Sequence, residues 1–213
     1  TSGADTNDGL SEATAVKTLE QAYAIMGAAI ERAAEGSQAS LKIVGLYELG
    51  TTQVEFPNAS FHVTISGKTT ADGFSFTGGG SQSTRVVDIN GPTTFQNMRL
   101  HMNHAKNTYN FIGCNGHKVV FGEGMNCTAN KANCYFTLAG GAYGGDAIAS
   151  TDLTVRSGKW NTIYVGGYTT KVTGQAKADI SDCWVYHQIV PSYRGAAGSV
   201  DIKVANTTVS IMN

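Results

Sequence analysis

The sequence predicts an all-β protein, a parallel β-helix whose short strands stack coil upon coil behind a single N-terminal helix. Apolar residues recur at helical spacing only near the N-terminus, and the later segments alternate apolar and polar residues. These segments recur at intervals of 20 to 35 residues, most of them near 20 to 25. Asn-Gly or Asp-Gly pairs do not recur every dozen residues, as the two-residue hairpins of a sandwich would require, which favours the solenoid.

The predicted helix covers residues 16–34 and ends at Gly36. A stack of coils leaves an apolar end, and an amphipathic helix is a suitable cap for it. We therefore expect one domain over residues 1–213, with a turn and capping helix in 1–38 and coils in 39–213. The apolar stripe of the helix consists of Val16, Leu19, Ala22, Tyr23, Met26, Ala29, Ile30 and Ala33.

The remainder of the chain consists of β-branched segments bounded by Gly, Asn, Asp or Ser. The chain has 26 glycines and only three prolines, as expected where tight corners need positive φ. Two longer intervals leave room for loops or for an intervening coil near "TFQNMRL". Comparable strands are expected to start at Leu41, Phe61, Arg85, Lys118, Leu153, Lys177 and Val200.

The segment "GADTNDGLSEATAVKTLEQA" resembles the start of right-handed parallel β-helix proteins of the pectate-lyase-like superfamily. The stretches "LTVRSGKWNTIYVGGY" and "KVTGQAKADIS" are similar to a coil pattern of bacterial surface and secreted β-helix proteins. The resemblance implies a single-stranded right-handed β-helix and a secreted or cell-surface location. Because the superfamily contains lyases, hydrolases, adhesins and binding modules, the fold alone does not determine the function.

The composition argues against several partners. The net charge is −1 and Lys and Arg are scattered singly, so neither nucleic acid nor an anionic membrane surface is expected as a partner. Apolar runs such as "LKIVGLYEL" are far shorter than the roughly 20 residues of a membrane span, so no membrane insertion is expected. The chain starts at Thr1 and ends in a strand-like run, so we expect a module of a longer protein, linked in cis to catalytic modules.

The four cysteines, Cys114, Cys127, Cys134 and Cys183, contain no C-x-x-C pair, which argues against a zinc ribbon or a thioredoxin-like redox site. Two interpretations stay open: disulfides, with Cys114–Cys134 favoured, or buried free thiols.

No metal or cofactor is expected either. "DTNDG" at residues 5–9 departs from a calcium loop because Gly9 occupies the third ligand place, although calcium stays the alternative to a simple turn. His101 and His104 point to opposite faces of a strand, so they share a metal only if the chain turns between them.

No catalytic residue is predicted. A lyase needs a base and positive charge beside a uronate, and a hydrolase needs two carboxylates across the bond. None of the candidates stands in a motif of the superfamily's enzymes. They are Arg156, Lys171 and Lys177 for the first role and Asp146, Asp152, Asp179 and Asp182 for the second.

Aromatic residues give the clearest functional pattern. Strand alternation places Trp160 and Tyr164 on one face, opposite the apolar Ile163. Trp160 and Trp184 are 24 residues apart, one predicted coil, so the two indoles are expected on adjacent rungs about 4.8 Å apart. The same spacing adds Tyr135 and Tyr109 to this ladder, and Tyr186 and Gln188 share the predicted face of Trp184.

An exposed aromatic ladder is typical of a binding surface, and sugars stack their C–H faces on such rings. Polar neighbours are expected beside it for the hydroxyl groups, among them Lys159, Asn161, Lys177, Asp182 and Gln188. The sequence thus predicts a non-catalytic module that binds a polysaccharide such as xylan or pectin. The alternatives are a polysaccharide lyase or glycoside hydrolase with an atypical site, and an adhesin or spacer whose rings fill the interior.

Overall fold

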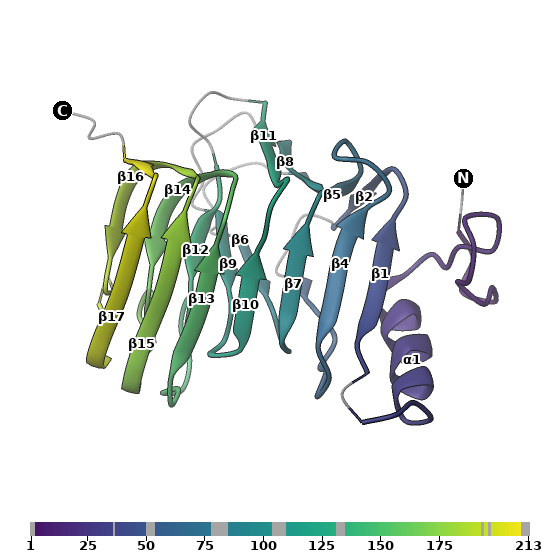
Figure 1. Ribbon diagram of the computed structural model, residues 1–213, viewed down its shortest axis with the longest axis horizontal. Helices are drawn as coiled ribbons and strands as arrows, with labels where there is room; N and C mark the ends of the chain where they lie inside the picture. Colours follow the sequence, from purple (N-terminus) through teal and green to yellow (C-terminus); the bar gives the residue numbers. More distant parts are fainter. Residues whose placement is uncertain are drawn as a thin grey trace.

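The protein is a parallel β-solenoid of about six turns, as the spacing of the strands predicts. Figure 1 shows the coils side by side from α1 at one end to β17 at the other. All pairings between strands are parallel, and three sheets run along the stack. The computed structural model describes residues 3–35, 37–49, 54–77, 85–103, 110–130, 135–192, 194–195 and 197–209.

Sheet A contains one strand of each coil. Its core-facing side chains are mostly apolar and its outer face is mostly polar, because alternate residues of a strand point to opposite sides. In order, its strands are β1 (Ala39–Ile43), β4 (Val63–Gly67), β7 (Thr93–Gln96), β10 (Lys118–Phe121), β13 (Thr151–Val155), β15 (Val172–Ser181) and β17 (Ala197–Ala205).

The other two sheets complete the coils. Sheet B has four strands, β2 (Leu46–Glu48), β5 (Gly73–Thr77), β8 (Arg99–Asn103) and β11 (Asn126–Ala129). Sheet C has seven strands, β3 (Val54–Glu55), β6 (Arg85–Asp88), β9 (Asn110–Gly113), β12 (Thr137–Ala139), β14 (Lys159–Tyr164), β16 (Trp184–Val190) and β18 (Thr208–Val209).

The predicted strand positions are largely confirmed, with one reassignment. The segment starting at Arg85 is β6 of sheet C, and the next strand of sheet A, β7, starts at Thr93. The expected intervening coil near "TFQNMRL" is present as β7 and β8, which accounts for one of the two long intervals.

Helix α1 (Leu19–Ile30) covers the first coil. It begins later than predicted because Thr18 caps it, its hydroxyl oxygen accepting a hydrogen bond from the N–H of Gln21 at 3.2 Å, and it ends at Ile30. Leu19, Tyr23 and Met26 pack into the same core as the coils. The predicted members Val16 and Ala33 lie outside the helix. Among the described residues, no helix is long and apolar enough to cross a membrane.

The interior contains a ladder of aromatic rings. Phe95 and Phe121 are register partners on β7 and β10, and their rings stack at 5.3 Å. Phe121 also meets the ring of Trp160 edge to face at 4.9 Å. Such contacts add about 0.5–1.5 kcal/mol per pair to the burial of the rings themselves. The large aromatic side chains of the coils therefore stabilise the stack from within.

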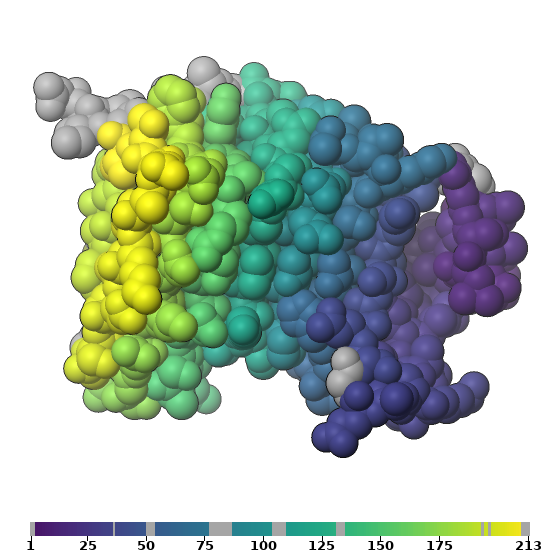
Figure 2. Space-filling view, in the orientation of Figure 1, coloured from purple at the N-terminus to yellow at the C-terminus, as the bar shows by residue number. Residues whose placement is uncertain are grey.

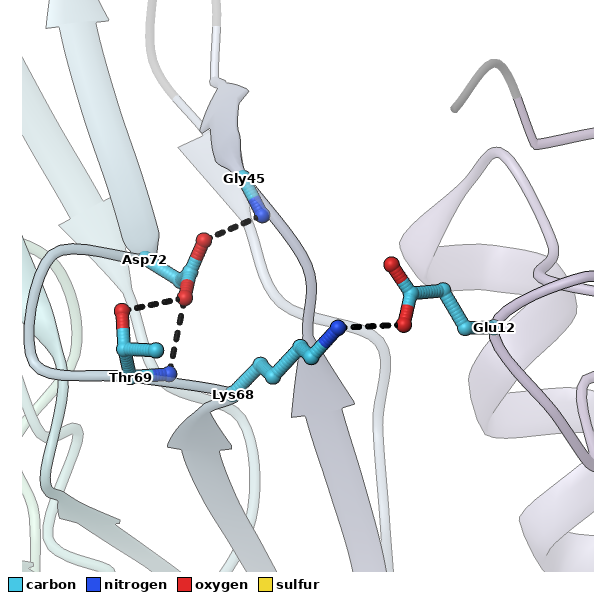
Figure 3. A network of polar contacts seen from close by, with 5 residues as sticks. All are labelled: Glu12, Gly45, Lys68, Thr69 and Asp72. Atoms are coloured by element: carbon cyan, nitrogen blue, oxygen red, sulfur yellow. Dashed lines mark hydrogen bonds and ion pairs between the residues drawn. The ribbon is translucent and has the colours of Figure 1, made fainter.

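A corner network ties the N-terminal turn to the first coils (Figure 3). The Asp72 carboxylate accepts hydrogen bonds from the N–H of Gly45 at 2.6 Å and from the N–H and hydroxyl of Thr69 at 2.7 and 2.6 Å. Next to it, Lys68 forms an ion pair with Glu12 at 2.5 Å. The hydrogen bond from the Thr69 hydroxyl is the main reason that the pKa of Asp72 lies below its ordinary value.

Candidate functional site

Three aromatic rings stack on the outer surface of sheet C. Trp184 and Tyr186 lie on β16, with ring centroids 5.6 Å apart and planes at 16°. Tyr135, just before β12, stacks on Tyr186 at 4.8 Å and 21°. Trp184 keeps 40% of its surface exposed, and the two tyrosines are half-buried. We call Trp184, Tyr186 and Tyr135 the outer stack.

A β-bulge brings the members of the outer stack together. Between Trp160 and Thr162 of β14 lies one residue, whereas two residues of β16, Tyr186 and His187, lie between their register partners Val185 and Gln188. A bulge changes the direction of a side chain within a strand. Here Tyr186 lies in the bulge and reaches Tyr135, which lies beside a strand two positions away in sheet C.

A depression of about 390 Å³ adjoins the outer stack. Tyr135 belongs to its wall, and Lys159, also in the wall, is the register partner of Trp184. The outer stack and the depression are thus one continuous surface. The lining residues are Met125, Asn126, Cys127, Thr128, Ala129, Tyr135, Gly158 and Lys159.

Hydrogen bonds between neighbouring coils hold the corners around the depression. Ser157 donates to the carbonyl of Gly122 at 2.6 Å and accepts from the N–H of Met125 at 3.0 Å. Gly158 has φ +97, and a Cβ there would lie 3.0 Å from Cys127 Sγ and 3.1 Å from the Trp160 ring. A side chain at this position would be strained and would crowd the wall of the depression.

One side of the depression borders a polar cluster on sheet B. Arg99 Nε donates to Thr128 Oγ1 at 2.8 Å, and its Nη2 lies 3.1 Å from His101 Nδ1. Because a guanidinium only donates, His101 Nδ1 is the acceptor. Burial, and then the charge of Arg99, lower the pKa of His101, which keeps the ring neutral at neutral pH. Arg99 and Lys159 therefore supply positive charge close to the depression.

The expected exposure of Trp160 is wrong. Its side chain is fully buried, and its indole Nε1 donates to the carbonyl of Ser157 at 3.0 Å. Its register partner is the fully buried Val185, whereas Trp184 is opposite Lys159. One residue of register changes the face to which a side chain points. Trp160 therefore belongs to the interior ladder and offers no surface to a ligand.

Tyr164 belongs to a second aromatic cluster on the outer face of sheet C, and only 7% of its surface is exposed. Its ring lies 5.4 Å from Tyr168, which stacks on Tyr143 at 4.9 Å. Phe111 contacts all three of these rings. The Gly-rich segments "GGAYGGD" and "GYTT" supply Tyr143 and Tyr168, and they cover Tyr164.

Next to this cluster lies a second depression of about 380 Å³. Glu55 of β3 and Asp88 of β6 are register partners, and both line it. Asn115 Nδ2 donates to Asn90 Oδ1 at 2.9 Å beside them. Its lining residues are Glu55, Asp88, Asn90, Asn115, Ala142, Tyr143 and Gly144.

The remaining predicted ligand-binding residues fall at several places. Gln188 is half-buried on β16, and Asn161 lies opposite the bulge. Asp182 is exposed in the turn just before Trp184, with φ 54. Lys177 is on sheet A, between register partners Asp152 and Asp201, so it does not belong to the outer stack. Tyr109 lies outside the described residues.

Sequence analysis missed Asn126 and Thr128 in the first depression, and Glu55 and Asp88 in the second. Lys159 was expected beside the aromatic ladder, and it is the register partner of Trp184 and lines the first depression. The other residues carry no local motif, and only the coil register brings them together.

Of the acidic and basic residues considered for catalysis, Asp152, Lys177 and Asp179 lie on the paired strands β13 and β15 of sheet A, and none of the candidates lines either depression. Arg156 and Asp179 form an ion pair on sheet A. In the N-terminal turn, Asp5 Oδ1 accepts from the N–H of Lys17 and of Thr18, each at 2.9 Å, and Asp8 Oδ1 accepts from the N–H of Leu10. The carboxylates of this turn thus bond main-chain donors. Within the described ranges, no three His, Cys, Asp or Glu side chains group to hold a metal, and His104 lies outside them.

Cys114, Cys127 and Cys183 are buried free thiols. Burial raises the pKa of the Cys114 thiol, and it raises that of Cys127 to about 12. Cys134, the expected disulfide partner of Cys114, lies outside the described residues.

No family model, curated protein or solved structure gives a significant match to the chain.

Proposed function

We propose that the protein binds a polysaccharide on the outer stack and in the adjoining depression, without cleaving it. The observation that carries this proposal is the continuity of the two features through Tyr135 and Lys159. Aromatic rings offer a sugar apolar surface, and the amide, hydroxyl and ammonium groups of Asn126, Thr128 and Lys159 suit its hydroxyl groups.

The shape of the surface supports a polymer rather than a small molecule. The depression of about 390 Å³ is at the low end of the roughly 300–1,000 Å³ of small-molecule sites. The outer stack extends it across β12, β14 and β16. A ligand that uses both features runs along the solenoid axis at the stack and turns toward β11 at Tyr135.

Charge favours an acidic glycan such as pectin over a neutral one such as xylan. Lys159 lines the depression, and Arg99 bonds Thr128 in its wall. The resemblance of the N-terminal segment to pectate-lyase-like proteins also supports a plant cell-wall polymer as ligand. A secreted or cell-surface location and a linked catalytic module follow from the same proposal.

Affinity electrophoresis against soluble pectin, xylan and neutral glucans tests the proposal. We expect pectin to retard the protein, and Trp184→Ala to weaken binding about tenfold or more, about 1.4 kcal/mol. Tyr168→Ala is the matched control, because it removes a ring from the second aromatic cluster instead. Unchanged retardation in Trp184→Ala, or no retardation by any polymer, contradicts the proposal.

Fluorescence gives an independent readout, because the chain has only two tryptophans. In Trp160→Phe the exposed Trp184 is the single tryptophan, and added polysaccharide should shift or quench its emission. In Trp184→Phe the buried Trp160 remains, and the same polysaccharide should leave its emission unchanged.

A second candidate function, glycoside hydrolysis, is favoured by the second depression. Retaining glycosidases hold two carboxyl groups about 5–5.5 Å apart, and Glu55 and Asp88 lie on adjacent paired strands in one lining. An assay for new reducing ends in the same mixtures tests it. Product that disappears in both Glu55→Gln and Asp88→Asn supports hydrolysis, and absence of product in the unchanged protein rejects it.

A further inference from the structure

The last coil of the solenoid exposes residues that face the core. Val200, Ile202 and Val204 of β17 are register partners of the buried Ala176, Ala178 and Ile180 of β15. Yet 41% of Val200 and 49% of Val204 are exposed, because the described chain places no further coil over them. Val209 of β18, partner of the buried Val185, is likewise 40% exposed. This end of the core is therefore uncovered in the described part of the chain.

The edge of sheet A at this end is long. β17 has nine residues, and within the described ranges it pairs with β15 on one side only. A long edge strand offers its main-chain groups to another strand. In Figure 2 the yellow β17 forms the end of the molecule opposite the purple N-terminal segment. The other end is covered by α1, which prevents head-to-tail stacking of copies.

The sequence of β17 is complementary to itself in the antiparallel direction. It reads Val200-Asp201-Ile202-Lys203-Val204, with opposite charges at equal distances from Ile202. A two-fold axis at Ile202 places each Val200 opposite a Val204 and each Asp201 opposite a Lys203. A slip of one residue would put core-facing side chains opposite outward-facing ones.

We propose that two copies of this chain associate tail to tail, with their β17 strands paired antiparallel about Ile202. Sheet A then continues from one copy into the other, and the exposed valines of the two ends cover each other. The proposal concerns an interface away from both depressions and does not rest on polysaccharide binding.

The outer face of sheet A supports this direction of pairing. One row of register partners alternates in charge, Lys118, Asp152, Lys177 and Asp201, and in the next row Asp179 precedes Lys203. Antiparallel pairing continues both rows, because the second copy supplies Lys203 to the first row and Asp201 to the second. Parallel, in-register pairing of two copies would instead put Asp201 beside Asp201, a destabilising contact.

Sedimentation velocity of the 213-residue chain over a concentration series tests the proposal. We expect a reversible monomer–dimer equilibrium. Asp201→Lys and Lys203→Asp should each weaken self-association about tenfold or more, because each creates two like-charged pairs across the axis. Asp152→Lys is the matched control: it reverses a charge in the same row, away from the edge, and should leave the dimer unchanged.

Mixing the two variants is the decisive step. The Asp201→Lys copy then presents two positive charges, the Lys203→Asp copy presents two negative charges at the same positions, and opposite charges meet across the axis. The mixture should therefore form heterodimers although each variant alone is monomeric. Circular dichroism checks that each variant is folded. If a charge-reversed variant does not fold, the neutral variant at the same position, Asp201→Asn or Lys203→Gln, replaces it. The neutral variant should weaken the dimer less than charge reversal does. A monomeric unchanged chain, open-ended oligomers, or a mixture that stays monomeric would overturn the proposal.

Discussion

Arg156 and Asp179 form a two-pronged ion pair across adjacent strands of sheet A, with Nη1 3.0 Å from Oδ1 and Nη2 2.8 Å from Oδ2. The hydrogen bond from Arg156 is the main reason that the pKa of Asp179 lies below its ordinary value. The two side chains keep 34% and 43% of their surface exposed, so water screens the pair. We therefore expect it to contribute at most about 1 kcal/mol.

This contribution should depend on pH. Because folding lowers the pKa of Asp179, the pair stabilises the protein above the unfolded value of about 3.9. The stabilisation is lost as the pH falls through the lower folded pKa. Urea unfolding should show Asp179→Asn to be less stable than the unchanged protein at neutral pH, and the difference should shrink in acid. A difference that is the same at both pH values contradicts this assignment.

Trp160→Ala should destabilise the protein by about 3–5 kcal/mol, because it opens a cavity beside Phe121 in the interior ladder. Trp184→Ala should cost less than about 1 kcal/mol, since Trp184 is 40% exposed. Chemical denaturation of the two variants measures both values. Equal losses would mean that Trp160 is not the interior ring.

Cys114 and Cys127 should resist alkylation in the folded protein. Both thiols are buried, and burial raises both pKa values, so little reactive thiolate forms at about pH 8. Iodoacetamide treatment followed by peptide mass mapping should find these two residues unmodified without denaturant and modified in urea. Rapid labelling of Cys127 in the folded state would contradict its burial.

Thr18→Ala should destabilise the protein by about 1 kcal/mol through loss of the helix cap. The matched control is Thr14→Ala, which removes a hydroxyl that bonds the Ser11 hydroxyl in the preceding turn. Thermal unfolding compares the two, and a larger loss from the control would show that the turn, rather than the cap, holds α1.

The fold was predictable because its signals are local. Alternation within each strand and the single helical stripe predicted the strands and α1, and the spacing of the strands along the chain predicted the solenoid. The outer stack was predictable in part, since Tyr135, Tyr186 and Trp184 were expected on one surface and their rings do stack on one another.

What sequence could not supply is the register between coils. Trp160 pairs with Val185, 25 residues later, and the assumed 24 moved it to the wrong face. The bulge at Tyr186 depends on two strands at once, and so does the meeting of Glu55 with Asp88. The residue pattern of a single strand does not reveal that neighbouring coils differ in length.

Because α1 covers the first coil, the order of synthesis also sets the order in which the coils can form. Each later strand pairs with a strand that precedes it in the chain, so its template already exists when it leaves the ribosome. Within the described chain, the end covered by α1 is thus made before the end formed by β17. During synthesis, each new coil can pair with the strands of the coil formed just before it.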